Sequence, residues 1–263
     1  MKPLILLTRP KGKNAGLSTR LSEQGLATIA LPVLELKPID SVVVPNPSDY
    51  DLLVFVSGFA VDCYIQSLQR LGLSQWPGAT QAAAVGRATA QAVINTGVVP
   101  VDLVLSPSMD SRQDSEALWA ELQAQGVHPE HVLIVSGDSG RTWLAEKFAQ
   151  AGAKVQRHCA YVRTAAQWSD HQLTALRKLL IPSQKLLVLL TSRQGVDAWL
   201  SNMQEASMIA LVQNACFVVV HERIAMYVRQ CVARLYPDAK PTIIVSKPDE
   251  KSLFQSIMTI AQA

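Results

Sequence analysis

Residues 155–164 read VQRHCAYVRT, and residues 30–38 read ALPVLELKP. Each run is longer than an ordinary strand of about five or six residues, so each looks like a strand that extends beyond its sheet. If the two extensions pair with each other, the chain between them forms one α/β domain inserted into a second domain that both chain ends build. A simple division into N-terminal and C-terminal halves is the alternative that composition does not exclude.

Short leucine-rich or β-branched runs alternate with longer amphipathic segments, a pattern typical of βα units and parallel sheets. Ten runs are predicted strands, five in each domain: residues 4–8, 28–32, 52–56, 81–85, 101–105, 132–136, 154–158, 186–190, 216–220 and 242–245. We therefore expect an α/β fold with two doubly wound, five-stranded parallel-sheet domains joined by a two-stranded antiparallel linker. The first domain would combine residues 1–36 with 165–263, the inserted domain would span 40–160, and the connecting strands would lie near 33–39 and 160–165.

Helix boundaries are marked by glycine and by a capping motif. A left-handed residue commonly follows the last turn of a helix, and five glycines stand at such expected ends: Gly25, Gly72, Gly97, Gly126 and Gly152. Ser169 and Gln172 have the spacing of a capping box, which predicts a helix that begins after Ser169. These boundaries agree with the βα alternation.

Composition and charge limit the class of protein. Of the 263 residues, 49% are hydrophobic and 17% are charged, which indicates a large interior and excludes a disordered or fibrous chain. The apolar runs are far shorter than the roughly 20 residues of a membrane-spanning helix, and the run at 4–7 is too short for a signal peptide. A net charge of +3 is too small for non-specific nucleic-acid binding. We expect a cytoplasmic protein with neither a membrane nor a nucleic-acid partner.

The turns that follow the predicted strands gather groups suited to anions. At the carboxyl ends of parallel strands, helix N-termini and backbone N–H groups favour negative charge. Hydroxyl residues and glycines recur in these turns in both predicted domains, together with Arg9, Arg87, Arg141, Arg193 and Arg223. Cations at helix N-termini oppose the macrodipole, so a bound polyanion is one explanation and surface ion pairing is the other. Individually, the hydroxyl residues also suit helix capping.

Several other chemistries lack their motifs. There is no G-x-x-x-x-G-K-[ST] loop, and no G-x-G-x-x-G follows a strand, so a nucleotide cofactor is poorly supported. The five histidines and four cysteines show no metal-ligand spacing and no disulfide framework. There is also no G-x-S-x-G elbow that would indicate acyl hydrolysis. A transferase that uses a sugar nucleotide is disfavoured because the phosphate-binding signal is missing.

Taken together, these turns resemble the uroporphyrinogen-III synthase family. The similar blocks keep their order and spacing over nearly the full chain: Leu6 to Pro10, Val56 to Val61, Ala84 to Ala90, Ser115 to Leu118, Ser136 to Arg141, Tyr161 to Arg163, Leu190 to Arg193 and Glu222 to Ala225. One departure is His221, where a small hydroxyl residue is common in the family. The family's two flavodoxin-like domains, joined by a two-stranded ladder, agree with the inserted-domain arrangement.

The resemblance implies cyclisation of hydroxymethylbilane, a linear tetrapyrrole with eight carboxylates, to uroporphyrinogen III with inversion of ring D and loss of water. It also implies a monomeric lyase of haem biosynthesis that needs no cofactor and no metal. Spontaneous closure gives the unrearranged isomer, so the protein must favour the path through a spiro intermediate. The alternative is a non-catalytic tetrapyrrole- or anion-binding regulatory protein of the same fold, which would be expected to carry an output module.

By similarity to the family's conserved tyrosine, Tyr161 is the expected proton donor to the departing hydroxyl group. A phenol is neutral at pH 7 and is able to donate a proton. Packing on the connecting strand is the structural alternative for this side chain. The residues expected to bind the substrate are Thr8, Arg9, Ser57, Gly58, Gly86, Arg87, Thr89, Ser136, Gly137, Arg141, Thr191, Ser192, Arg193, Glu222 and Arg223.

Overall fold

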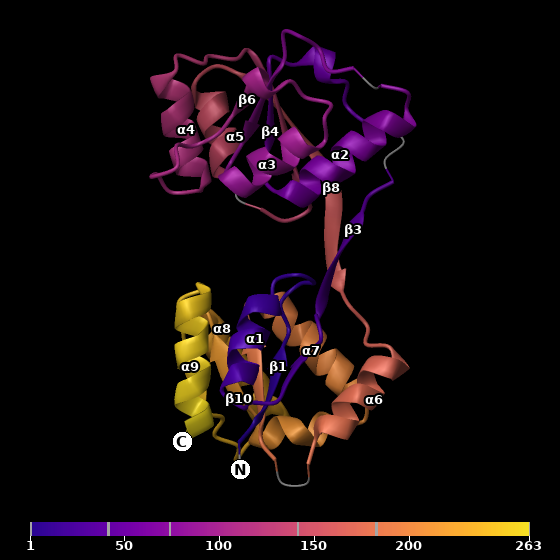
Figure 1. Cartoon of the computed structure of the whole chain (residues 1–263), viewed down its shortest axis with the longest axis vertical. Helices are drawn as coiled ribbons and strands as arrows, with labels where there is room; N and C mark the ends of the chain where they lie inside the picture. The colour runs from indigo at the N-terminus through magenta and orange to yellow at the C-terminus, as the bar shows by residue number, and fades with distance from the viewer. Residues whose placement is uncertain (1, 41–42, 74, 141, 182–183, 263) are drawn as a thin grey trace. The chain divides into compact units, whose positions relative to one another are not determined.

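The chain forms two units in its computed structural model, which describes residues 2–40, 43–73, 75–140, 142–181 and 184–262. The first unit consists of Met1–Glu35 and Thr164–Ala263, and the second of Leu36–Arg163. The chain passes between the units twice, in β3 and in β8 (Figure 1).

The first unit contains a five-stranded sheet in the order β11-β10-β9-β1-β2. Its strands are β1 (Leu4–Leu7), β2 (Thr28–Ala30), β9 (Leu186–Leu190), β10 (Cys216–Val219) and β11 (Ile243–Val245). Every neighbouring pair is parallel, as the alternation of strands and helices predicts. The chain adds β2 on one side of β1 and β9 on the other, so the strand order reverses between β1 and β9. Ligands of doubly wound sheets bind beyond the carboxyl ends of the strands at such a reversal.

Helices cover both faces of this sheet. One face carries α1 (Ala15–Glu23) and α9 (Glu250–Gln262), and the other carries α6 (Asp170–Leu179), α7 (Arg193–Glu205), α8 (Glu222–Leu235) and the 3-10 helix η3 (Ile209–Asn214). Leu4 and Leu6 pack toward α7 and α8, whereas Ile5 and Leu7 pack toward α1 and α9, which lie side by side (Figure 1). Because both faces are buried, β1 is a continuous apolar run.

The second sheet has the order β3-β8-β7-β4-β5-β6. Its strands are β3 (Leu34–Pro38), β4 (Leu52–Phe55), β5 (Gln81–Ala84), β6 (Val104–Leu105), β7 (His131–Gly137) and β8 (Lys154–Ala165). The pairs from β8 to β6 are parallel, and the strand order reverses between β4 and β7. Five strands are expected here from the sequence, and that number is wrong by one: β8 is a strand of 12 residues, and its long edge accepts β3 as a sixth.

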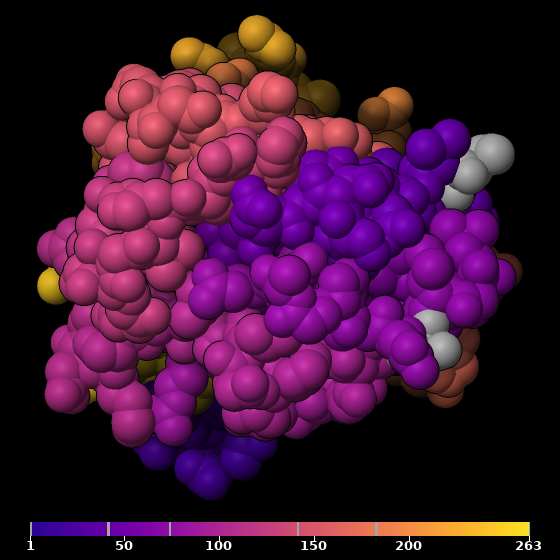
Figure 2. Space-filling view, turned by 90° about the horizontal axis from the view of Figure 1, so that it is seen from above, coloured from indigo at the N-terminus to yellow at the C-terminus, as the bar shows by residue number. Residues whose placement is uncertain are grey.

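Helices also cover both faces of the second sheet. They are α2 (Gly58–Arg70) and α3 (Arg87–Asn95) on one face, and α4 (Ser115–Ala124) and α5 (Trp143–Gln150) on the other. Two 3-10 helices, η1 (Pro47–Asp49) and η2 (Val101–Leu103), precede β4 and β6. Leu53 and Phe55 pack toward α2 and α3, whereas Leu52 and Val54 pack toward α4 and α5. Figure 2 shows the outer atoms of this unit's segments, coloured purple to pink.

Two backbone hydrogen bonds define the pairing of β3 with β8. The Ile39 N–H donates to the Ala160 carbonyl at 3.0 Å, and the Ala166 N–H donates to the Val33 carbonyl at 2.8 Å. As the residue number rises along one strand it falls along the other, so the two strands are antiparallel in this stretch. The remaining strand pairs of both sheets that are described above are parallel.

The ten strands predicted from the sequence are all found, and one is much shorter than predicted. In segment 101–105, the Leu103 N–H turns back to the Pro100 carbonyl, so three residues form η2 and only two form β6. The five glycines predicted to end helices all have a positive φ, between 66° and 94°. The capping box is present as predicted, because the Ser169 side chain accepts the Gln172 N–H and the Gln172 side chain accepts the Ser169 N–H.

His158, a buried histidine of β8, should make stability depend on pH. It is 9% exposed, and its ring meets Tyr64 edge to face at 5.7 Å. Burial lowers the pKa of His158 below its ordinary value. The imidazole of the unfolded chain takes up a proton below about pH 6.5, where the folded one is still neutral. The free energy of unfolding should therefore decrease as the pH falls from about 6.5 toward the lowered pKa.

Urea unfolding measured from about pH 7.5 to about pH 5 tests this expectation. His158→Phe keeps an aromatic ring but cannot titrate, so its stability should depend less on pH than that of the wild type. His171→Gln, at an exposed histidine of α6, is the matched control for the loss of an imidazole. Equal pH dependence in His158→Phe and the wild type would contradict the prediction.

Candidate functional site

The carboxyl edge of the second sheet places Tyr161 beside Ser57. Ser57 follows β4 and caps α2, where its Oγ accepts the Ala60 backbone N–H at 3.2 Å and Gly58 is the first helical residue. The Ser57 Oγ and the Tyr161 Oη are hydrogen-bonded at 3.2 Å. Ser57 therefore stands at the reversal of strand order between β4 and β7, and Tyr161 reaches it from β8.

A β-bulge determines the direction of the Tyr161 side chain. Ser136 pairs with Cys159 but Gly137 pairs with Tyr161, so Ala160 is an extra residue in β8. Strict alternation would place Ala160 and Tyr161 on opposite faces of the sheet. Both instead pack in the core under α2 and α3. The bulge therefore turns the phenol toward the N-terminus of α2.

Two further residues hold the ring of Tyr161. The ring of Phe59 meets it edge to face, with the centroids 5.1 Å apart and the planes at 80°. The backbone of Gly137 lies directly against the ring, since a Cβ added there would be 2.7 Å from Cε2 and 2.8 Å from Cζ. Tyr161 is 8% exposed, so its ring is nearly fixed by these neighbours.

The turn after β5 is closed by the chain itself. The backbone N–H of Arg87, at the start of α3, donates to Gln113 Oε1 at 2.7 Å. The side chain of Gln113 also packs on Gly86, and its Nε2 donates to two backbone carbonyls of the preceding loop at 3.1 Å. Thr89 is buried in α3. Gly86 and Thr89 are therefore buried, whereas the side chain of Arg87 is exposed.

A pocket of about 200 Å³ opens between the first turns of α4 and α5, at the same edge of the sheet. Ser136, Gly140 and the exposed Arg157 of β8 line it. Ser136 is buried, and its hydroxyl donates to the Gly137 carbonyl at 3.1 Å. The pocket thus offers a cation near backbone groups. Arg141, a predicted binding residue of this turn, lies outside the described residues.

In the first unit, the turn after β1 is tied to its own neighbours. Thr8 is buried, and its hydroxyl donates to the Leu189 carbonyl of β9. Arg9 Nε donates to Asn14 Oδ1 at 3.1 Å, and Asn14 Nδ2 donates back to the Arg9 carbonyl at 2.9 Å. Burial lowers the pKa of Arg9, and the carboxylate of Glu250 acts in the opposite direction. Arg9 is therefore a half-buried cation at the reversal between β1 and β9.

The turn after β9 meets the same edge of the first sheet. Ser192 caps α7, and its Oγ accepts the Gly195 N–H at 3.0 Å. Thr191 is half-buried, whereas Arg193 is exposed, with its guanidinium 4.2 Å from the centre of the Tyr227 ring. Since β1 and β9 are paired, the structure brings this turn next to that of Thr8 and Arg9.

The turn after β10 lies one strand farther from the reversal. His221 caps α8, because its Nδ1 accepts the Arg223 N–H at 3.0 Å. Histidine thus supplies here the capping that a small hydroxyl residue would supply. Glu222 forms an ion pair with Arg229 at 3.1 Å, whereas the side chain of Arg223 is exposed.

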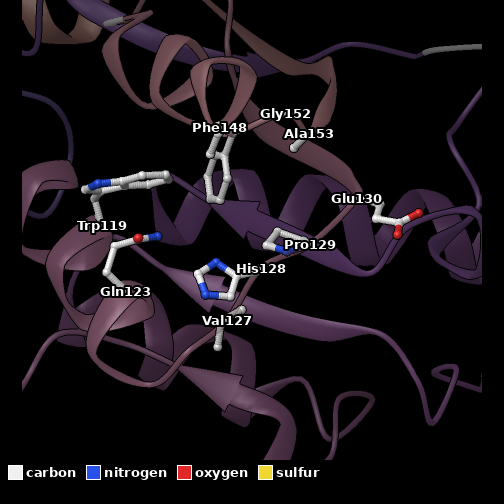
Figure 3. A pocket seen from close by; sticks show the side chains of 10 residues that line it. Trp119, Gln123, Val127, His128, Pro129, Glu130, Phe148, Gly152 and Ala153 are labelled. Carbon is white, nitrogen blue, oxygen red and sulfur yellow. The ribbon is translucent and has the colours of Figure 1, made fainter.

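A further pocket of the second unit lies at the opposite edge of that unit's sheet. Figure 3 shows it, with Trp119 of α4, Phe148 of α5 and His128 lining a space of about 140 Å³. Its wall includes the residues immediately before β7 and β8, so it lies at the amino edge. The predicted site residues follow the strands at the carboxyl edge, and none of them lines this pocket.

Three structural features bear on other classes of site. Among the described residues, no group of three or more His, Cys, Asp or Glu side chains is placed to hold a metal ion. In that same part of the chain, no helix has the length and apolar character needed to cross a membrane. The cysteines are free, with Cys159 half-buried and Cys63, Cys216 and Cys231 buried.

Two doubly wound parallel sheets with polar carboxyl edges define a mixed α/β protein. The model of the family described as uroporphyrinogen-III synthase HemD matches residues 15–244. The chain belongs to this family.

Relatives and solved structures agree with this membership. The uroporphyrinogen-III synthase of Salmonella typhimurium is 30% identical over 169 residues, which are 62% of this chain and 66% of that protein. The Escherichia coli protein of the same name is 29% identical over 171 residues, again 62% of this chain and 66% of the relative. The crystal structure of uroporphyrinogen-III synthetase from Helicobacter pylori has a TM-score of 0.58 at 15% identity, covers 99% of this chain and 100% of its own, and shows a shared fold. The chain therefore aligns with just under two thirds of the length of the Salmonella and Escherichia proteins.

Several residues that build these edges are absent from the sequence-based prediction. Asn14 had a usable signal, because asparagine is common just before a helix and α1 begins at the next residue. Phe59 looks like an ordinary helix residue in the sequence, and its contact with Tyr161 depends on the bulge. No sequence pattern marks Gln113 or Arg157, because each side chain lies against a turn that is distant in sequence.

Proposed function

We propose that this chain catalyses the closure of hydroxymethylbilane to uroporphyrinogen III, with inversion of ring D and loss of water, as a lyase of tetrapyrrole biosynthesis. Family membership supports the reaction, and the Salmonella and Escherichia relatives carry the corresponding name. The structural observation that carries the proposal is the phenol of Tyr161, held by Ser57 where the strand order of the second sheet reverses.

In this proposal, Tyr161 acts as the general acid. The C–O bond of the hydroxymethyl group breaks, and the departing hydroxyl takes the phenolic proton and leaves as water. The carbon left electron-poor accepts an electron pair from the attacking pyrrole ring. The proton that this ring system later loses restores the phenol. Such proton transfer by a positioned side chain accelerates reactions by about 10²-fold to 10⁴-fold.

Binding of eight carboxylates is distributed in the proposal. Arg87, Arg193 and Arg223 are exposed cations at helix N-termini, and Arg9 is a half-buried one. Charge-assisted hydrogen bonds from guanidinium groups are among the stronger ones for carboxylates. The exposed Arg157, in its pocket of about 200 Å³, adds a further cation. The hydroxyl groups and backbone N–H groups of the same turns complete the proposed set.

The proposal extends to organisation. The two units would be two domains, residues 1–36 with 165–263 and residues 40–160, joined by the antiparallel strands β3 and β8. The protein would act in the cytoplasm as a monomer, without a cofactor and without a nucleic-acid or membrane partner. The family resemblance supports these points.

The test is to incubate the protein with freshly prepared hydroxymethylbilane, oxidise the products and separate the isomers. We expect the type III isomer to predominate, whereas buffer alone gives type I. Type I alone in the presence of folded protein would refute the proposed activity. Saturable binding of the substrate with no type III product would instead favour the regulatory alternative.

A further inference from the structure

We propose that Gly137 and Ser57 are positioning residues, which together fix the phenol of Tyr161 for proton transfer. The inference rests on the proposed function, and it gives both residues a role other than direct binding of the substrate. Gly137 would set the place of the ring, and Ser57 would set the direction of the hydroxyl hydrogen. All three residues belong to the second unit.

Gly137 determines how far the ring can approach the sheet. A Cβ at this position would lie 2.7 Å from Cε2, 2.8 Å from Cζ and 3.2 Å from Cδ2 of Tyr161. The overlap involves the far end of the ring, so an alanine would push out the part that carries the hydroxyl. Phe59 packs edge to face against the same ring and limits where it can go. A methyl group at residue 137 would therefore move the Tyr161 Oη away from Ser57.

The bulge makes this close approach possible. Gly137 is the residue that pairs with Tyr161 after the extra residue Ala160, and the Asp138 N–H donates to the Tyr161 carbonyl at 2.9 Å. The backbone of Tyr161 is thus held while its ring lies on the glycine. The ring cannot escape a new methyl group by shifting its own backbone without breaking this pairing.

Ser57 orients the hydroxyl. Its Oγ already accepts the Ala60 N–H at 3.2 Å, so its own hydrogen remains for the Tyr161 Oη, 3.2 Å away. If Ser57 donates, the phenolic hydrogen is left to point at the substrate. The N-terminus of α2, a helix of 13 residues, also favours the negative charge that develops on the phenolic oxygen as the proton leaves. Ser57 therefore acts through Tyr161.

The test is a set of double-mutant cycles with type III formation as the readout. Gly137→Ala and Ser57→Ala are each made in the wild type and in Tyr161→Phe. In the wild type, each should lower kcat by about tenfold to about a hundredfold with little change in KM. In Tyr161→Phe, neither should change kcat by more than about twofold, because the hydroxyl that they position is already gone. Ser57→Thr, which keeps a hydroxyl, should restore most of the activity lost in Ser57→Ala.

Two controls separate positioning from folding. Ser169→Ala removes another N-cap serine, and Gly78→Ala adds a methyl group where nothing lies within 4 Å of the new Cβ. Both should keep the wild-type kcat, and thermal unfolding identifies any variant that does not fold. If Gly137→Ala does not fold, the double-mutant cycle of Ser57→Ala with Tyr161→Phe tests the positioning role by itself.

The outcomes distinguish the inference from the proposed function. Losses that persist at full size in Tyr161→Phe, or that appear in KM instead of kcat, would overturn positioning and favour direct substrate contact. Full activity of Ser57→Ala would overturn it as well. A wild-type protein that yields only type I would refute the proposed function itself.

Discussion

Tyr161→Phe should lower kcat for type III formation by about a hundredfold, with KM changed much less. General acids contribute about 10²-fold to 10⁴-fold, and phenylalanine removes the proton while keeping the ring. The packing against Phe59 and Gly137 involves ring atoms, so the fold of the second unit should be retained. The loss should therefore appear in turnover, not in the midpoint of thermal unfolding. Type I should rise in its place, because released or unprocessed substrate closes spontaneously.

A matched control is Tyr50→Phe in the same unit. The Tyr50 hydroxyl also donates a hydrogen bond, to Gln156 Oε1 at 2.7 Å, but Tyr50 precedes β4 and so lies at the amino edge. Its loss should leave kcat and the isomer ratio unchanged. If Tyr161→Phe retains full turnover, another group must donate the proton. The acid role of Tyr161 would then fail, although the proposed reaction would stand if type III is still formed.

The central strands, such as β1, β4 and β9, were predictable because they are buried on both faces. In β1, Leu4 and Leu6 face one helix layer and Ile5 and Leu7 face the other, so the strand has to be apolar at every position. Five helix ends were equally clear, since the left-handed conformation at Gly25 and at comparable positions is most accessible to glycine. Elements set by local chemistry were therefore accessible without coordinates.

The direction of the Tyr161 side chain could not be predicted from the sequence. The pattern of residues 155–164 indicates a long strand but not the extra residue Ala160 that turns the phenol to the α2 face. A bulge depends on how two strands pair, and one strand carries no clear mark of it. The same reason hides Gln113, which closes the turn of Gly86 and Arg87 from a loop 26 residues further along the chain.

The predicted arginines also differ among themselves in a way that the sequence does not show. Arg9 is half-buried and bonded to Asn14, and Arg193 stacks on Tyr227. The asparagine and the aromatic ring are uncharged, so neither contact is an ion pair, although the carboxylate of Glu250 also acts on the charge of Arg9. Such contacts restrict the side chains, and a restricted side chain loses less entropy when it binds a ligand. Glu222, another predicted binding residue, differs from these arginines. Its carboxylate is already paired with the guanidinium of Arg229.

Asn202→Leu should lower the free energy of unfolding by about 3 kcal/mol, because it leaves two buried backbone groups without a hydrogen-bond partner. Asn202 lies buried on α7 and ties down the segment that follows β8. Its Oδ1 accepts the Trp168 N–H at 2.9 Å, and its Nδ2 donates to the carbonyls of Ala166 and Ala198 at 2.8 Å. Leucine fills similar space but leaves the Trp168 N–H and the Ala166 carbonyl without this partner, and each buried unpaired group costs about 1–3 kcal/mol.

Urea unfolding of Asn202→Leu beside Ser201→Ala measures this effect. Ser201 is the exposed neighbour on the same helix, and its hydroxyl donates to Glu205 at 3.0 Å, so its removal should change stability by less than about 0.5 kcal/mol. Ala166 also donates its N–H to Val33, and the Trp168 indole N–H donates to the Pro32 carbonyl. Asn202 therefore anchors the end of β8 where it pairs with the chain entering β3. Stability of Asn202→Leu equal to that of the wild type would show that water or a rearranged backbone replaces the lost partners.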